Sequence, residues 1–91
     1  MKICVFGLWH LGSVTSACLA SLGHQVIGID DDVNIVKRLQ SARAPVFEKG
    51  LDELIHEGLK EKKLIFTSDY SEIPKDIDFV WITIDTPVDE E

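Results

Sequence analysis

The sequence predicts an α/β fold, a doubly wound parallel sheet of about four strands with helices on both faces. Short runs at 3–6, 26–30 and 79–84 are mostly apolar on both faces, the second ending in Asp30, as strands buried on both faces are. Gly7 closes the first run, and helical periodicity starts directly after it. A strand, a helix and a strand of this length form a right-handed parallel unit.

The first helix is expected to follow Gly7 and to end at Gly23, which supplies a left-handed cap. Its apolar residues recur every three or four positions and predict one stripe against the sheet: Leu11, Val14, Thr15, Cys18, Leu19 and Leu22. After the second strand, Asp31 or Asp32 can cap a short helix over about 33–41. That helix would turn Val33, Val36 and Leu39 inward.

The second half of the chain continues the alternation. Residues 42–50 contain the first proline and break the periodicity, which predicts a loop. Apolar spacing resumes in a helix at Leu51, Leu54, Ile55 and Leu59, with Gly58 weakening its end. The remaining elements are a strand at 64–67, a turn at 70–73 capped by Asp69 and ended by Pro74, and a strand at 79–84.

Length and charge limit the functions open to this chain. Its 91 residues form a single domain, which is short for a dinucleotide-binding fold because that fold has two mononucleotide halves. We therefore expect a truncated domain. A net charge of −7 and a pI near 4.8 argue against nucleic acid and anionic membrane surfaces. No stretch approaches the roughly 20 apolar residues of a membrane span.

The cysteines and histidines do not form a recognisable reactive centre. Cys4 and Cys18 fall on faces expected to be buried, so we interpret them as small core residues in a protein of the reducing cytoplasm. His10, His24 and His56 lack metal-ligand spacing, and no metal is expected. No catalytic residue is predicted within the chain.

The turn between the first strand and helix is the strongest functional signal. A glycine-rich turn into a helix N-terminus favours a phosphate group, as in the G-x-G-x-x-G fingerprint of dinucleotide-binding folds. Asp30 ends the second strand, where a carboxylate would bind the ribose hydroxyls and repel a 2′-phosphate, favouring NAD over NADP. The expected cofactor-binding residues are Gly7, Leu8, Trp9, His10, Leu11, Gly12 and Asp30. Alternatively, the glycines form only a tight turn, and Asp30 only caps a helix.

Strand order places these residues together. If the doubly wound, Rossmann-like pattern holds, the strands lie in the order 3-2-1-4 with the first strand central. The Gly7–Gly12 turn, Asp30 and residues 83–87 then share the carboxyl edge of the sheet, where such sheets bind ligands.

Several separate segments resemble the N-terminal domain of the UDP-glucose/GDP-mannose dehydrogenase family. They are Met1-Lys2-Ile3-Cys4-Val5-Phe6-Gly7-Leu8, Val26-Ile27-Gly28-Ile29-Asp30, Pro45-Val46-Phe47-Glu48, Phe66-Thr67-Ser68-Asp69-Tyr70 and Thr86-Pro87. The resemblance covers the whole chain and implies an enzyme that oxidises the 6-hydroxyl of a nucleotide sugar to a carboxylate, using NAD and a covalent cysteine intermediate.

The resemblance assigns roles residue by residue. It implies that the Gly7–Gly12 turn holds the pyrophosphate, that Asp30 binds the adenosine ribose and that Thr86 lies on the nicotinamide side, while Glu48 matches an acid beside the active-site cleft. Neither cysteine matches the family's catalytic motif, so this chain alone is not expected to be active. The nucleotide sugar is expected to bind only to the full-length parent.

The sequence departs from the family pattern around the cofactor. Trp9 replaces the second glycine of the fingerprint, Asp85 the glycine before Thr-Pro, and Ile35 a frequent lysine. We therefore expect NAD binding that is weak or lost. The alternative is a non-catalytic Rossmann-like module that binds another nucleotide or a protein partner. The strand at 79–84 would be an uncovered edge, which predicts a homo-oligomer.

Overall fold

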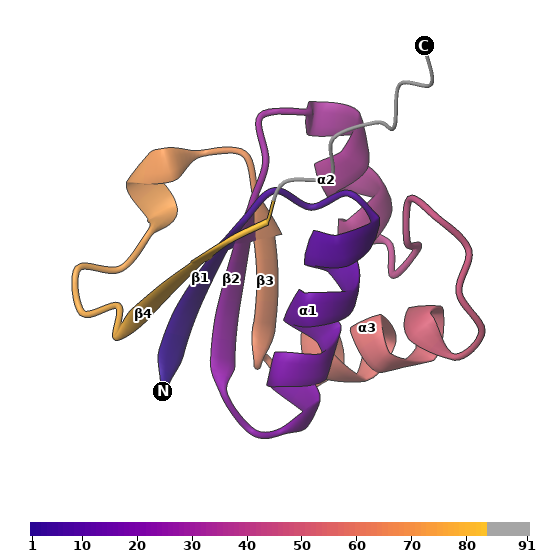
Figure 1. Ribbon diagram of the computed structural model, residues 1–91, viewed down its shortest axis with the longest axis horizontal. Helices are drawn as coiled ribbons and strands as arrows, with labels where there is room; N and C mark the ends of the chain where they lie inside the picture. Colours follow the sequence, from indigo (N-terminus) through magenta and orange to yellow (C-terminus); the bar gives the residue numbers. More distant parts are fainter. Residues whose placement is uncertain (84–91) are drawn as a thin grey trace, which may run out of the picture.

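The computed structural model describes residues 1–83 and confirms the predicted fold (Figure 1). Four parallel strands lie in the order β3-β2-β1-β4. The elements in chain order are β1 (Lys2–Phe6), α1 (His10–Ser21), β2 (Gln25–Ile29), α2 (Val33–Gln40), α3 (Leu51–Lys60), β3 (Leu64–Thr67), the 3-10 helix η1 (Tyr70–Glu72) and β4 (Phe79–Ile82).

The two faces of the sheet are covered differently. The larger core lies under the three α-helices, where Val5, Leu39 and Ile55 are fully buried. On the opposite face, Cys4 and Ile29 pack beneath the segment that connects β3 to β4. The helix on this second face is therefore the 3-10 helix η1, and the three α-helices share the first (Figure 1).

Helix α1 packs through its small residues, so the apolar stripe expected from periodicity was wrong. Leu11 and Leu22 are 48% and 72% exposed, and Cys18 is exposed. The buried positions are Gly12, Ser13, Ser16, Ala17 and Ala20. Small side chains bring the helix axis close to the sheet, and larger side chains such as Val14 and Leu19 then pack at the margins of the contact.

The three other helices begin and end close to their predicted positions. The Asp32 side chain caps α2 by accepting hydrogen bonds from the N–H groups of Asn34 and Ile35, whereas Val33 is exposed rather than turned inward. Gly58 lies inside α3, where an added Cβ would come within 3.0 Å of the Leu64 Cβ. Its lack of a side chain therefore allows α3 to pack tightly on β3.

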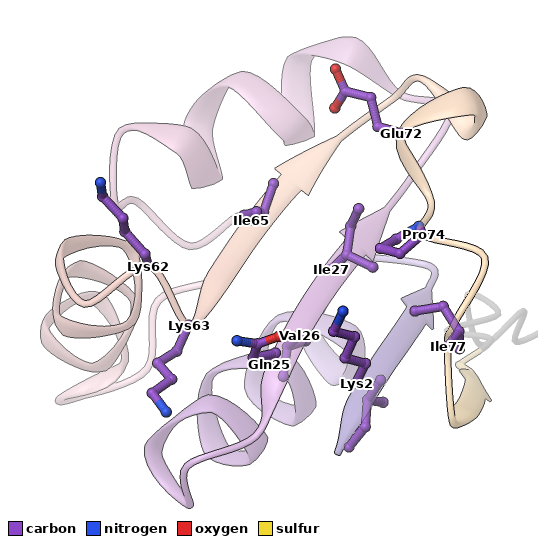
Figure 2. A pocket seen from close by; sticks show the side chains of 11 residues that line it. Lys2, Gln25, Val26, Ile27, Lys62, Lys63, Ile65, Glu72, Pro74 and Ile77 are labelled. Atoms are coloured by element: carbon purple, nitrogen blue, oxygen red, sulfur yellow. The ribbon is translucent and has the colours of Figure 1, made fainter.

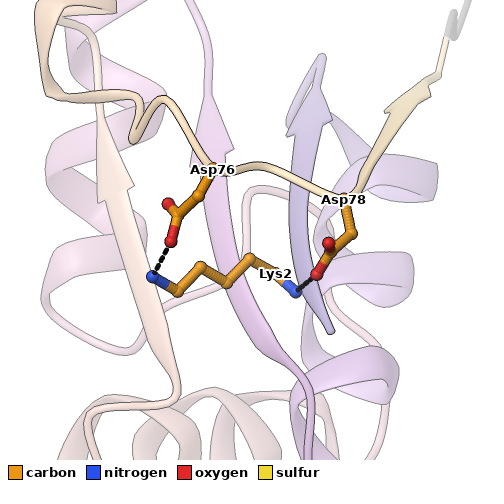
Figure 3. A network of polar contacts seen from close by, with 3 residues as sticks. All are labelled: Lys2, Asp76 and Asp78. Atoms are coloured by element: carbon orange, nitrogen blue, oxygen red, sulfur yellow. Dashed lines mark hydrogen bonds and ion pairs between the residues drawn. The ribbon is translucent and has the colours of Figure 1, made fainter.

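Polar contacts at Lys2 align β4 beside β1 (Figure 3). The Lys2 ammonium lies 2.6 Å from Asp76, and its backbone N–H donates to the Asp78 carboxylate at 2.9 Å. The hydrogen bond from Lys2 lowers the pKa of the Asp76 carboxyl below its usual value. Both aspartates belong to the segment that enters β4, so this network sets where that strand begins.

Candidate functional site

Two glycines shape the turn between β1 and α1. Gly7 has a φ of +91°, and a Cβ there would lie 2.4 Å from the carbonyl oxygen of Thr83. A Cβ on Gly12 would lie 1.6 Å from the carbonyl oxygen of Gly7. A side chain is therefore excluded at Gly7 by the positive φ and the close contact, and at Gly12 by the close contact.

Two hydroxyl groups hold the carbonyl oxygens of this turn. The Thr83 hydroxyl donates to the Gly7 carbonyl at 2.7 Å, and the Ser13 hydroxyl donates to the Leu8 carbonyl at 2.8 Å. Both side chains are buried. Sequence reasoning placed Thr83 at this edge without its hydrogen bond and missed Ser13, because a serine or threonine shows its partner only when the distant backbone is in place.

The N–H groups at the start of α1 form the part of the site suited to an anion. Within the described residues, the N–H groups of Trp9, His10 and Gly12 have no hydrogen-bond acceptor. The first turn of α1 also contains no acidic side chain. Unpaired N–H groups and the positive end of the helix dipole together favour a bound phosphate.

Asp30 lies beside this helix end and fixes the turn. Its Oδ2 accepts a hydrogen bond from the Leu8 N–H at 2.8 Å, and its Oδ1 accepts one from the Asp32 N–H at 2.8 Å. The cap of α2 is Asp32, so the alternative that Asp30 serves only as a helix cap was wrong. Each carboxylate oxygen keeps a lone pair that a ligand hydroxyl can use.

The other predicted site residues have different surroundings. The Leu8 side chain is fully buried in the core, so only its backbone faces the turn. Trp9 is the N-cap residue of α1, with a φ of −68° and an indole 47% exposed. Leu11 is also half exposed. His10 Nε2 lies 3.4 Å from the carboxylate of Glu48, which brings the loop at 42–50 to the same helix end.

Two predicted residues lie outside the described part of the chain. Thr86 and Asp85 follow Thr83, which is the last described residue. The statements made for them from the sequence therefore stay predictions.

A separate hollow of about 280 Å³ lies away from this turn (Figure 2). Its lining includes Lys2, Gln25 and Lys63, which mark the amino-terminal ends of three strands, and Ile27 and Ile77 from the sheet face opposite the α-helices. The glycine turn and Asp30 are at the carboxyl ends of their strands, so the hollow is not part of the predicted cofactor site.

No helix within residues 1–83 is long and apolar enough to cross a bilayer.

Comparisons with known proteins agree with this geometry. The model of the NAD binding domain of the UDP-glucose/GDP-mannose dehydrogenase family matches residues 1–91. GDP-mannose 6-dehydrogenase from Pseudomonas syringae pv. tomato is 36% identical over 87 residues, which are 96% of this chain and 20% of that protein. UDP-glucose 6-dehydrogenase from Pseudomonas aeruginosa is 35% identical over 91 residues, which are 100% of this chain and 20% of that protein.

Solved structures give the same result. A ternary complex of GDP-mannose dehydrogenase from Pseudomonas aeruginosa superposes with a TM-score of 0.89 and 32% identity, over 99% of this chain and 21% of that one. The UDP-D-ManNAc dehydrogenase from Pyrococcus horikoshii has a TM-score of 0.89 and 30% identity, over 98% of this chain and 21% of that one. This chain thus spans about a fifth of its relatives. These matches confirm the predicted resemblance and NAD as the cofactor class. They do not support the alternative of a non-catalytic Rossmann-like module that binds another nucleotide or a protein partner. The chain belongs to the UDP-glucose/GDP-mannose dehydrogenase family and corresponds to that family's NAD binding domain.

Proposed function

We propose that this domain holds NAD for a dehydrogenase that oxidises the 6-hydroxyl of a nucleotide sugar to a carboxylate. The observation that carries the proposal is a helix N-terminus with N–H groups that have no acceptor within residues 1–83, next to the Asp30 carboxylate at the carboxyl edge of a parallel sheet. The names of the relatives supply the substrate class, since they act on GDP-mannose or UDP-glucose.

Each part of the cofactor has a residue suited to hold it. The N–H groups of His10 and Gly12 would bind the pyrophosphate, and the Asp30 carboxylate would accept hydrogen bonds from the adenosine ribose. Thr86 is proposed for the nicotinamide side. When bound, NAD supplies the hydride acceptor for the oxidation. The backbone N–H groups at the start of α1 are suited to a pyrophosphate. Trp9 is the residue in this turn that departs from the fingerprint.

The cysteines of this chain do not supply the thiol of the proposed reaction. Cys4 is buried, and burial raises the pKa of its thiol, which keeps it protonated and unreactive. Cys18 is exposed on α1, outside the glycine turn. We propose that the catalytic cysteine belongs to another part of a longer enzyme, and that the enzyme works in the cytoplasm.

The role of Asp30 is tested by charge removal. Asp30→Asn is expected to weaken NAD binding several-fold and to narrow the preference for NAD over NADP, because the variant loses the anionic acceptor that repels a 2′-phosphate. Ligand-observed NMR with both dinucleotides, which follows millimolar affinities, measures this. Asp32→Asn is the matched control, since it removes the same charge two residues away and asparagine still caps a helix. Equal affinities of the unmutated chain for NAD and NADP would contradict the ribose role.

We also propose that the 91-residue chain self-associates through β4. Among the described residues, β4 pairs only with β1, and its four side chains are 40–67% exposed. An exposed apolar strand edge is a template for pairing with another strand.

Sedimentation at tens of micromolar is therefore expected to show a dimer or a larger species. Ile82→Lys should give a monomer, because it places a charge on this strand. Ile65→Lys, on β3 at the other edge of the sheet, is the matched control and should leave the association unchanged. A monomeric unmutated chain across this range would contradict the proposal.

A further inference from the structure

Tyr70 and Asp31 form a contact beside the predicted ribose site that the fold itself does not require. The Tyr70 hydroxyl donates a hydrogen bond to Asp31 Oδ1 at 3.0 Å. The tyrosine ring is held in place by Phe6, with ring centroids 5.8 Å apart. Asp69 caps the turn that presents Tyr70, accepting a hydrogen bond from the Ser71 N–H at 2.9 Å.

The three consecutive aspartates after β2 have three different partners. Asp30 accepts hydrogen bonds from the backbone of the glycine turn and of Asp32, and Asp32 caps α2. Asp31 is exposed, and among the described residues its carboxylate accepts a hydrogen bond from the Tyr70 hydroxyl. The Asp31 side chain therefore neither caps a helix nor holds the turn, which leaves its charge available for recognition.

Asp30 and Asp31 act on the same phenol. The pKa of Tyr70 is raised above its usual value by the hydrogen bond to Asp31, by loss of solvation and, to a smaller extent, by the negative charges of Asp31 and Asp30. Asp30 and Asp31 are consecutive residues directly after β2, so both charges lie at the carboxyl end of this strand. A 2′-phosphate on a ribose bound to Asp30 would therefore meet a second fixed negative charge.

We infer that Asp31, anchored by Tyr70, is a second specificity determinant that excludes NADP from this domain. The inference rests on the proposed binding of NAD at Asp30. An unphosphorylated ribose has no charge to be repelled, whereas a 2′-phosphate carries about −1.5 to −2 charges near neutral pH. The anchor matters because the hydrogen bond to Tyr70 restricts the rotation of an otherwise exposed side chain and so fixes the position of its charge.

The anchor is tested first, in the unliganded chain. Tyr70 is the single tyrosine of the sequence, so an absorbance titration of the phenol reports on this contact alone. Asp31→Asn is expected to lower the pKa of Tyr70, because the charge that stabilises the protonated phenol is lost. An unchanged titration would show that the contact is not formed and would overturn the inference.

The specificity is tested by binding. NAD and NADP are titrated into the unmutated chain and into Trp9→Gly, with ligand-observed NMR to follow millimolar affinities. In Asp31→Asn, the ratio of NAD to NADP affinity is expected to fall about threefold to fivefold, with NAD affinity nearly unchanged. Tyr70→Phe should change the ratio in the same direction by a smaller factor. Glu72→Gln, which removes an equal charge from the same 3-10 helix, should leave the ratio unchanged.

The outcomes separate this inference from the proposed function. If neither dinucleotide binds the unmutated chain or Trp9→Gly, the proposed function fails, and the inference fails with it. If NAD binds and Asp31→Asn leaves the ratio unchanged, the inference alone is overturned. A ratio that falls equally in Glu72→Gln would also overturn it, because the effect would then come from net charge rather than from the anchored carboxylate.

Discussion

Replacing Trp9 by glycine is expected to tighten NAD binding by about ten- to a hundredfold, from a millimolar or undetectable starting affinity. Trp9 stands where the fingerprint has a glycine that lets backbone approach the pyrophosphate. Its indole is 47% exposed at the start of α1, and we expect it to hinder the approach of a charged oxygen to the N–H groups there. Each such hydrogen bond contributes roughly 1.5–3 kcal/mol, and about 1.4 kcal/mol is a tenfold change in affinity.

The gain would come from the indole and not from backbone strain. Trp9 has a φ of −68°, which lies outside the left-handed region that favours glycine. Calorimetric titration of NAD into both versions measures the effect, and Phe47→Gly, which removes an exposed aromatic from the loop at 42–50, is the control. Tight binding by the unmutated chain, or no gain in Trp9→Gly, would show that the tryptophan does not limit binding.

Replacing Gly12 by alanine is expected to destabilise the domain by at least about 3 kcal/mol or to prevent folding. An added Cβ would lie 1.6 Å from the Gly7 carbonyl oxygen and 2.9 Å from the Thr83 hydroxyl oxygen. The first of these atoms is backbone in a turn held by Asp30 and Thr83, so it has no room to move. Overpacking by a methyl group usually costs about 1–3 kcal/mol, and a collision with fixed backbone costs more.

Urea denaturation measures this loss, with Ser16→Ala as the matched control. Ser16 lies on the same buried face of α1, and its hydroxyl has no hydrogen-bond partner among the described residues. Removing it is expected to leave the free energy of unfolding unchanged or to raise it by up to about 1 kcal/mol. A Gly12→Ala variant as stable as the control would show that α1 does not approach the turn this closely.

The amino-acid sequence by itself determined the architecture and the position of the glycine turn. Buried strands are recognisable as apolar runs, and the β1-α1-β2 unit has one favoured handedness, so the strand order could be predicted. The glycine turn, the cap at Asp69 and the family resemblance were equally local signals. Each depends on neighbouring residues, whose geometry is set by short-range sterics and hydrogen bonds.

Only the tertiary structure decided which face of α1 is buried and how three adjacent aspartates divide their partners. The sequence periodicity identifies only where apolar side chains recur. Helix α1 lies so close to the sheet that only small side chains fit between them, so Ser16 and Ala17 are buried while Leu11 and Leu22 are exposed. Asp30 and Asp31 bind groups 22 and 39 residues away. Those partners come near only after the chain has folded, because parallel strands bring sequence-distant segments to one edge of the sheet.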